Sequence, residues 1–294
     1  MYKSLADAIR DAEASGRTLS ATALALESKD QGRTVEDIRA ALRRALVVMR
    51  SAVERGLEGD LRSASGLVGG DALLVARSHA GPMSGTLFSD VLARALAVQE
   101  VNAAMGVIVA APTAGGAGVL PAVLTGIARN RAIGDEQVID ALATAGLIGA
   151  VVAERASLSG AEGGCQAETG AAAGMAAGAA TEMLGGTPTQ VGHAVALTMQ
   201  GTLGLVCDPL GGLVELPCVF RNATGAALAL AGIEMALAGI TFAIPVDEVI
   251  DVMGEIGRNM DVRYRETAGG GLAATPTGRR LAKERLVQIR TAPR

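Results

Sequence analysis

The apolar residues of this chain are almost all aliphatic, and this restricts the kind of core that the chain can build. Hydrophobic residues make up 50% of the 294 residues, but aromatic residues make up only 2%. A core without large rings has to be filled by Ala, Val, Leu, Ile and Met side chains. The chain also contains 39 Gly, which let backbones approach one another closely because nothing projects from a glycine. The composition therefore predicts close packing of elements that meet through small residues.

Long segments rich in Ala and Leu predict helices instead of strands. Thr34 followed by Asp37 resembles a capping box, and the apolar spacing after it predicts a helix that stops near Gly56. Residues 107–110 are the one short apolar run that could form a strand. Gly-rich turns separate the remaining helices, which we expect at residues 87–105, 135–156, 170–184, 188–202 and 222–243.

These segments together predict an all-α protein with one mainly helical domain. We expect residues 1–60 to form an N-terminal helical extension and residues 61–294 to form the main domain, with Gly-rich turns around the functional site. The polar, Gly-rich stretch at residues 261–278 is typical of a mobile loop.

Charge and hydropathy exclude several classes of protein. The formal net charge of -4 and the pI near 5.4 argue against nucleic acid as the main partner, which would require a basic face. The N-terminus lacks the apolar core of a secretory signal, so we expect a cytoplasmic protein. The uncharged stretch 101–128 is broken by Pro and Gly, and the stretch 223–245 is broken by Glu234, so we expect no membrane span.

The three cysteines, Cys165, Cys207 and Cys218, all lie within 54 residues, and each has Gly or Pro nearby. In a chain without a secretory signal, an odd and small number of cysteines points to metal binding or catalysis instead of a disulfide framework. The simpler reading is three buried, inert thiols. Turns leave thiolates accessible to a ligand, so a shared metal site is an equal alternative.

Two kinds of metal site fit three thiolates. A structural zinc site needs four ligands, and His193 could be the fourth, which would make the protein a non-enzymatic, zinc-stabilised helical scaffold. A 4Fe-4S cluster held by three cysteines would keep one iron open as a Lewis acid. The spacing of the cysteines does not decide between the two.

Several separated stretches carry a family resemblance. They are MRSAVERGL at residues 49–57, AAPTAG at 110–115, GCQAE around Cys165, GLVCDPLGGLVELPC at 204–218 and GGLAATPTGRRLA at 270–282. On these stretches the chain resembles the alpha subunit of iron-sulfur-dependent L-serine dehydratases over nearly its whole length. The resemblance implies a 4Fe-4S cluster on the three cysteines and elimination of water from L-serine to give pyruvate and ammonia.

The resemblance also implies that a beta subunit shares the active site. Within this chain, Ser65, Thr113 and Asn222 are the candidates for binding substrate, because each lies at a turn in a family-like stretch; Ser65 and Asn222 could equally be ordinary helix caps. No general base is evident, since His79 and His193 are the only histidines, and the partner could supply one.

Two further sequence features bear on the reaction. Gln200, Gly201 and Phe220 depart from the pattern expected of the family, so a related hydroxy-amino acid stays open as the substrate. A pyridoxal-phosphate mechanism would need a Schiff-base lysine. The only lysines are Lys3, Lys29 and Lys283, and none lies in the Gly-rich central region.

Overall fold

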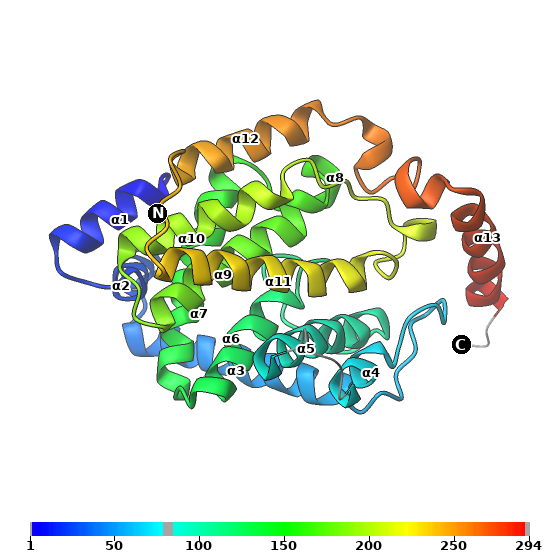
Figure 1. Ribbon diagram of the computed structural model, residues 1–294, viewed down its shortest axis with the longest axis horizontal. Coiled ribbons are helices and arrows are strands. Elements are labelled where there is room, and N and C mark those ends of the chain that lie inside the picture. Colours follow the sequence, from blue (N-terminus) through cyan, green and yellow to red (C-terminus); the bar gives the residue numbers. More distant parts are fainter. Residues whose placement is uncertain (1, 79–84, 292–294) are drawn as a thin grey trace.

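The computed structural model describes residues 2–78 and 85–291, which form helices joined by turns and contain no strand (Figure 1). The prediction of an all-α fold is confirmed. A π-helical turn, Gln166–Gly170, directly precedes one of the helices. The α-helices are α1 (Leu5–Ala14), α2 (Leu19–Gln31), α3 (Val35–Leu57), α4 (Asp71–Arg77), α5 (Thr86–Ala103), α6 (Val119–Arg131), α7 (Asp135–Arg155), α8 (Gly160–Gly163), α9 (Ala171–Met183), α10 (Pro188–Met199), α11 (Cys218–Leu237), α12 (Val246–Asn259) and α13 (Pro276–Thr291).

Helix α9 lies at the centre of the molecule, against α7, α10, α11 and α6 (Figure 1). Its sequence, AAAGMAAGAATEM, places small residues on every side of the helix, and nearly all of them are buried. A methyl group on Gly178 would lie 2.4 Å from Ile148 Cδ1 and 2.8 Å from Val195 Cγ2. The neighbouring helices therefore approach as closely as the sequence composition predicts.

The first 60 residues contribute to the same core as the rest of the chain. Leu5, Leu19 and Leu46 are fully or almost fully buried in the hydrophobic cluster that also contains α9. Helix α1 packs on α10, α2 packs on α7, and α3 packs along α5. At the last of these crossings, a methyl group on Gly56 would lie 2.2 Å from the carbonyl oxygen of Ala97, so the two backbones are in direct contact.

Carboxylates that are buried or half-buried hold the N-termini of three helices. Asp247 of α12 accepts a hydrogen bond of 2.8 Å from the first backbone N–H of α1, and Glu182 of α9 accepts one of 2.7 Å from the first N–H of α2. Glu100 of α5 accepts one of 2.9 Å from Ala72 N in the first turn of α4. The first N–H groups of a helix lack partners within the helix and carry a partial positive charge. Each carboxylate therefore fixes one helix against another.

Several local predictions can now be judged. The capping box of Thr34 and Asp37 is present. The five expected central helices are present, with ends that shift by up to three residues in four of them and with the last one ending at Leu237, six residues before the expected end. The strand proposed at residues 107–110 is wrong, because this segment is irregular and has no partner strand among the described residues. The last central helix begins at Cys218, directly after Pro217, four residues earlier than expected.

Helix α7 is long and apolar enough to cross a membrane by length and composition alone. In the fold, 67% of its most apolar window is buried against other helices. This is the environment of a core helix. Among the described residues, the segments at 101–128 and 223–245 contain no helix that is long and apolar enough to cross a membrane.

Candidate active site

The three cysteines converge from three separate segments of the chain. Cys165 directly precedes the π-helical turn, Cys207 lies in an extended segment that pairs with Arg265, and Cys218 is the first residue of α11. Their exposed fractions are 2%, 2% and 4%, and none forms a disulfide. Burial raises the pKa of Cys207, and the negative charges of Cys165, Glu168 and Cys218 raise it further. The thiols are therefore close enough to influence one another.

The described residues do not form a ligand set for a single metal ion. Burial and the charges of Cys165 and Glu168 raise the pKa of Cys218 to about 12, so the free thiols are neutral, and a bound cationic group would draw off their protons. Zinc–sulfur bonds of about 2.3 Å require ligand sulfurs within roughly 4 Å of one another. No three His, Cys, Asp or Glu side chains in the described part of the chain are arranged to hold one ion. In a cluster, each thiolate binds a different iron atom, so the sulfurs stand further apart.

The two histidines do not complete this site in the described structure. His193 of α10 accepts a hydrogen bond of 3.2 Å at Nδ1 from the backbone N–H of Phe242, and it lines a cavity with Ile9 of α1 and Val246 of α12. His79 lies outside the described residues. The structure therefore does not place His193 as a fourth ligand.

Glu168 provides a half-buried carboxylate beside the cysteines. Thr113 Oγ1 donates a hydrogen bond of 2.8 Å to its Oε1. Methyl groups on Gly115 and Gly160 would lie 2.8 Å and 2.7 Å from its Oε2, so only glycine at these positions leaves room for the carboxylate. Burial raises the pKa of Glu168, the hydrogen bond from Thr113 lowers it, and the charge of Glu266 raises it.

Asn222 joins the turn before α6 to the helix that begins at Cys218. Its Nδ2 donates hydrogen bonds of 2.7 Å to the carbonyl of Gly115 and 2.9 Å to that of Cys218, while its Oδ1 accepts one of 2.9 Å from Gly118 N. The side chain is fully buried. These bonds use both N–H groups of the amide, so Asn222 holds backbone in place; its contact with substrate stays a prediction.

Ser65 is tied to the segment that precedes Cys218. Its backbone N–H donates a hydrogen bond of 3.0 Å to Oε1 of Glu215, and its hydroxyl donates to Oε2 of the same carboxylate. Glu215 is only 4% exposed. This pair brings the 65–71 turn next to the third cysteine, where binding of substrate by Ser65 likewise stays a prediction.

The Gly-rich stretch near the C-terminus, expected to be a mobile loop, is instead bonded to the Cys207 segment. Cys207 N donates a hydrogen bond of 2.8 Å to the carbonyl of Tyr264, and Glu266 N donates one of 2.8 Å to the carbonyl of Cys207. The next residue, Asp208, accepts one of 2.6 Å from Leu272 N. Its other oxygen lies 2.7 Å from Arg221 Nη1, as an ion pair that lacks hydrogen-bond alignment. We call residues 261–275 the strap.

A cavity of about 350 Å³ lies beside the Cys165 segment. Its lining includes Gly163 and Ala167, together with Arg258 of α12 and Arg265 of the strap. The Nε–H of Arg265 is buried and has no hydrogen-bond partner among the residues that the structure describes. A buried N–H donor without a partner is costly, so this group is suited to an anionic ligand.

Four residues of this site were missed as individual candidates by sequence reasoning. Glu168 and Glu215 lie three residues after and before a cysteine, and Asp208 follows Cys207 directly. Their proximity to the cysteines was the available signal, but only the fold shows that their carboxylates point inward. Arg265 had no such signal, because it reaches Cys207 from a segment 58 residues later in the sequence.

Comparison with known proteins shows the family of this chain. The family model described as "Serine dehydratase alpha chain" matches residues 14–273. A Bacillus subtilis protein described as "Probable L-serine dehydratase, alpha chain" is 50% identical over 286 residues, which is 97% of this chain and 95% of the relative. The "L-serine dehydratase, alpha chain" of Peptoniphilus asaccharolyticus is 41% identical over 88% of this chain and 89% of the relative. An "L-serine dehydratase" of Streptomyces coelicolor is 42% identical over 87% of this chain but only 57% of the relative. The chain therefore belongs to the serine dehydratase alpha chain family.

Proposed function

We propose that this chain is the alpha subunit of a cytoplasmic L-serine dehydratase, a lyase that converts L-serine to pyruvate and ammonia. The observation that carries the proposal is the convergence of three buried, unpaired cysteines from three segments that the chain shares with its family. The relatives that it matches over most of their length have L-serine dehydratase in their descriptions.

Cys165, Cys207 and Cys218 are the residues that would hold a 4Fe-4S cluster. Such a cluster, with one iron free of protein ligands, supplies a Lewis acid for a hydroxyl leaving group. Three buried cysteines, none of them in a disulfide, are the thiolate ligands that such a cluster would use. The strap and the Asn222 hydrogen bonds keep the ligand segments in place.

The residues around the cysteines can bind the other groups of the substrate. Glu168 is a carboxylate beside the reaction site, held by Thr113, and it can accept a hydrogen bond from the substrate ammonium group. Arg265 has a buried Nε–H that is free to donate to the substrate carboxylate. We assign these two positioning contacts to them in addition to the predicted contacts of Ser65 and Thr113.

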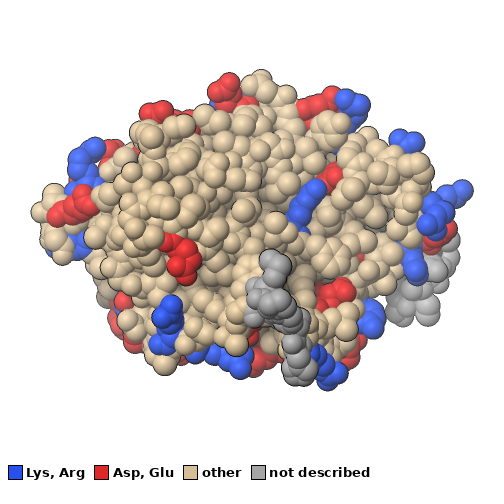
Figure 2. Space-filling model, in the orientation of Figure 1, with Lys and Arg blue, Asp and Glu red and all other residues tan. Residues whose placement is uncertain are grey.

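A beta subunit is the partner that we propose to cover this site. The match covers only 57% of the Streptomyces relative, and a separate subunit could supply the region that the match leaves out. Apolar side chains are exposed near the cysteines, namely Phe220, Val262 and Leu272, with exposed fractions of 43%, 58% and 49%. Figure 2 shows a broad face of the molecule on which charged side chains gather mainly along the edge. Such a surface suits burial against a partner.

Iron, sulfide and zinc analysis of protein purified without oxygen tests the cofactor. We expect about four iron and four sulfide per chain, and serine-dependent formation of pyruvate after a beta subunit is added. Stoichiometric zinc without acid-labile sulfide would contradict the proposal and favour the zinc scaffold. Turnover of threonine or another hydroxy-amino acid in preference to serine would correct the substrate and leave the reaction class intact.

A further inference from the structure

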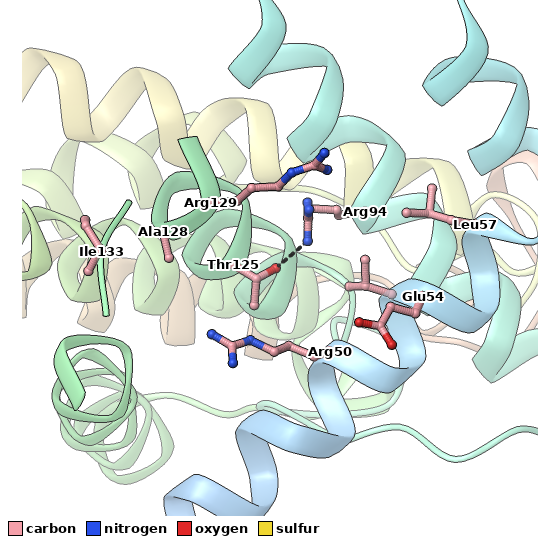
Figure 3. Close-up of a pocket in the computed structure, with 9 residues that line it drawn as sticks. Arg50, Glu54, Leu57, Arg94, Thr125, Ala128, Arg129 and Ile133 are labelled. Carbon is pink, nitrogen blue, oxygen red and sulfur yellow. Dashed lines mark hydrogen bonds between the residues drawn. The ribbon is translucent and has the colours of Figure 1, made fainter. Parts of the chain in front are cut away.

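A second cavity, of about 410 Å³, lies between α3, α5 and α6 and contains none of the cysteine-site residues. Figure 3 shows the guanidinium groups of Arg94 and Arg129 next to one another at one side of it and Arg50 at the other. Its charged lining consists of these three arginines and a single carboxylate, Glu54. The walls of the cavity are therefore predominantly cationic.

Asp90, a carboxylate outside the lining of the cavity, orients Arg94 and Arg129. Arg94 Nε donates a hydrogen bond of 2.8 Å to Asp90, and its Nη1 donates one of 3.1 Å to Thr125 Oγ1. Arg129 Nη1 donates one of 3.3 Å to the other oxygen of the same Asp90. One carboxylate thus serves two guanidinium groups, and Glu54 is the one carboxylate that lines the cavity itself. The Arg94 side chain is only 10% exposed, and its Nη2 makes no hydrogen bond with a described residue.

Arg50 is held in a similar way from the opposite wall. It makes hydrogen bonds of 2.8 Å and 2.6 Å to the two oxygens of Asp135, which also does not line the cavity. Guanidinium groups that are fixed from behind lose little conformational freedom on binding a ligand, and two of them together match the geometry of a carboxylate.

The remaining lining is apolar and consists of Val53, Leu57, Ala128 and Ile133. An inorganic anion would gain nothing from such a wall, whereas the carbon skeleton of an organic acid would be buried against it. The cavity volume also exceeds what a bare inorganic ion would fill.

The cavity is separate from the cysteine site but shares two helices with it. Gly118, the residue directly before α6, bonds to Asn222, and Arg129 lies 11 residues later, or about 16 Å along the helix. Helix α5 carries Arg94 at the cavity and Gln99 at the other end, where Gln99 Nε2 donates a hydrogen bond of 2.9 Å to the carbonyl of Ala114. The MRSAVERGL stretch, which the cysteine site does not use, supplies four lining residues: Arg50, Val53, Glu54 and Leu57.

We propose that this cavity is a binding site for a small organic acid, held through its carboxylate by Arg94 and Arg129 with its carbon chain against the α3 and α6 wall. The site is distinct from the one that binds the substrate, and the proposal does not depend on the proposed function.

Isothermal titration of the full chain with sodium succinate tests the proposal, with sodium phosphate and sodium chloride compared at equal ionic strength. We expect saturable binding of succinate and no saturable binding of phosphate or chloride. The Arg129→Gln variant should bind succinate about tenfold more weakly, because one charge-assisted hydrogen bond is lost. Arg129 is 70% exposed, so this variant should fold normally, whereas Arg94→Gln, which should abolish binding, could also disturb the core.

Matched controls separate this site from other causes of binding. Arg10→Gln, on the exposed surface of α1, should bind as the unmodified protein does, and so should Cys207→Ser, which alters only the cysteine site. Equal signals with succinate and chloride would show ionic screening and overturn the proposal, as would unchanged binding in Arg129→Gln. Phosphate binding as tight as succinate binding would refute the assignment to an organic acid, and loss of binding in Cys207→Ser would place the ligand at the cysteine site instead.

Discussion

In the helical core, neighbouring helices are held by the fit of small apolar side chains, whereas at the cysteine site irregular segments are held by buried polar side chains. Gly56 against Ala97 is an example of the first kind of contact. Asn222, Glu215 and Asp208 are examples of the second, and each bonds backbone from a distant part of the chain. The core is therefore sensitive to added volume, and the site is sensitive to lost hydrogen bonds.

The largest effect should come from removing a ligand at the site while the core is left alone. In Cys207→Ser, a hard hydroxyl replaces a soft thiolate, which is the preferred ligand of an iron-sulfur cluster. We expect loss of the visible cluster absorption and of serine-dependent turnover, with far-ultraviolet circular dichroism unchanged. A Cys207→Ser protein that kept its cluster and full turnover would show that Cys207 is not a ligand.

Adding one methyl group to the core should produce the next largest effect. Gly56→Ala places a methyl group 2.2 Å from the Ala97 carbonyl oxygen, so α3 and α5 must move apart. We expect the free energy of unfolding to fall by about 3 kcal/mol or more, measured by urea denaturation. The control is Gly146→Ala in α7, where nothing lies within 4 Å of the added methyl group and where stability should rise by roughly 0.5 kcal/mol. Equal effects of the two changes would contradict close packing at the α3–α5 crossing.

Removing a polar contact of the site should have a smaller effect on stability than the core substitution. Asn222→Ala leaves the Gly118 N–H and the Gly115 carbonyl without their partner, which should cost roughly 2 kcal/mol. We also expect iron to be lost to a chelator faster than from the unmodified protein, because the turn before α6 is no longer fixed to the Cys218 helix. The matched change Thr224→Ala alters an exposed hydroxyl two residues later. It should leave both the free energy of unfolding and the rate of iron loss as they are in the unmodified protein. Unaltered iron release in Asn222→Ala would mean that this contact serves only the fold.

Replacing the buried carboxylate of Glu100 should have the smallest effect on stability, and the effect should depend on pH. Burial raises the pKa of Glu100, although its hydrogen bonds from backbone N–H groups lower it. Because the folded pKa lies above the unfolded value of about 4.3, the contribution of Glu100 to stability is full below that value and is lost as pH rises through the folded pKa. Relative to Glu100→Gln, the unmodified protein should therefore lose stability between about pH 4 and the folded pKa, by ~1.4 kcal/mol for each unit of pKa difference. Parallel stability profiles for the two proteins, measured by urea denaturation across this range, would contradict the raised pKa.

The sequence by itself determined the all-α fold, the approximate bounds of the central helices and the family. Helical spacing and the shortage of aromatic residues are local properties, so they could be interpreted without knowing which elements meet. The three cysteines could also be singled out, because they stand beside turns in stretches that the family shares. The short run at residues 107–110 was misjudged because a strand requires a partner strand, which the local pattern does not reveal.

Only the tertiary structure decided which polar groups meet at the cysteine site. Glu168 reaches Thr113 across 55 residues, Ser65 reaches Glu215 across 150 residues, and the strap reaches Asp208 across 64 residues. The tertiary structure also decided that His193 accepts a hydrogen bond from the backbone of Phe242. It placed Arg94 beside Arg129 at a separate cavity. Hydrogen bonds and ion pairs act over a few ångströms and carry no periodic signal along the chain, so they become visible only after the helices have packed and brought distant segments together.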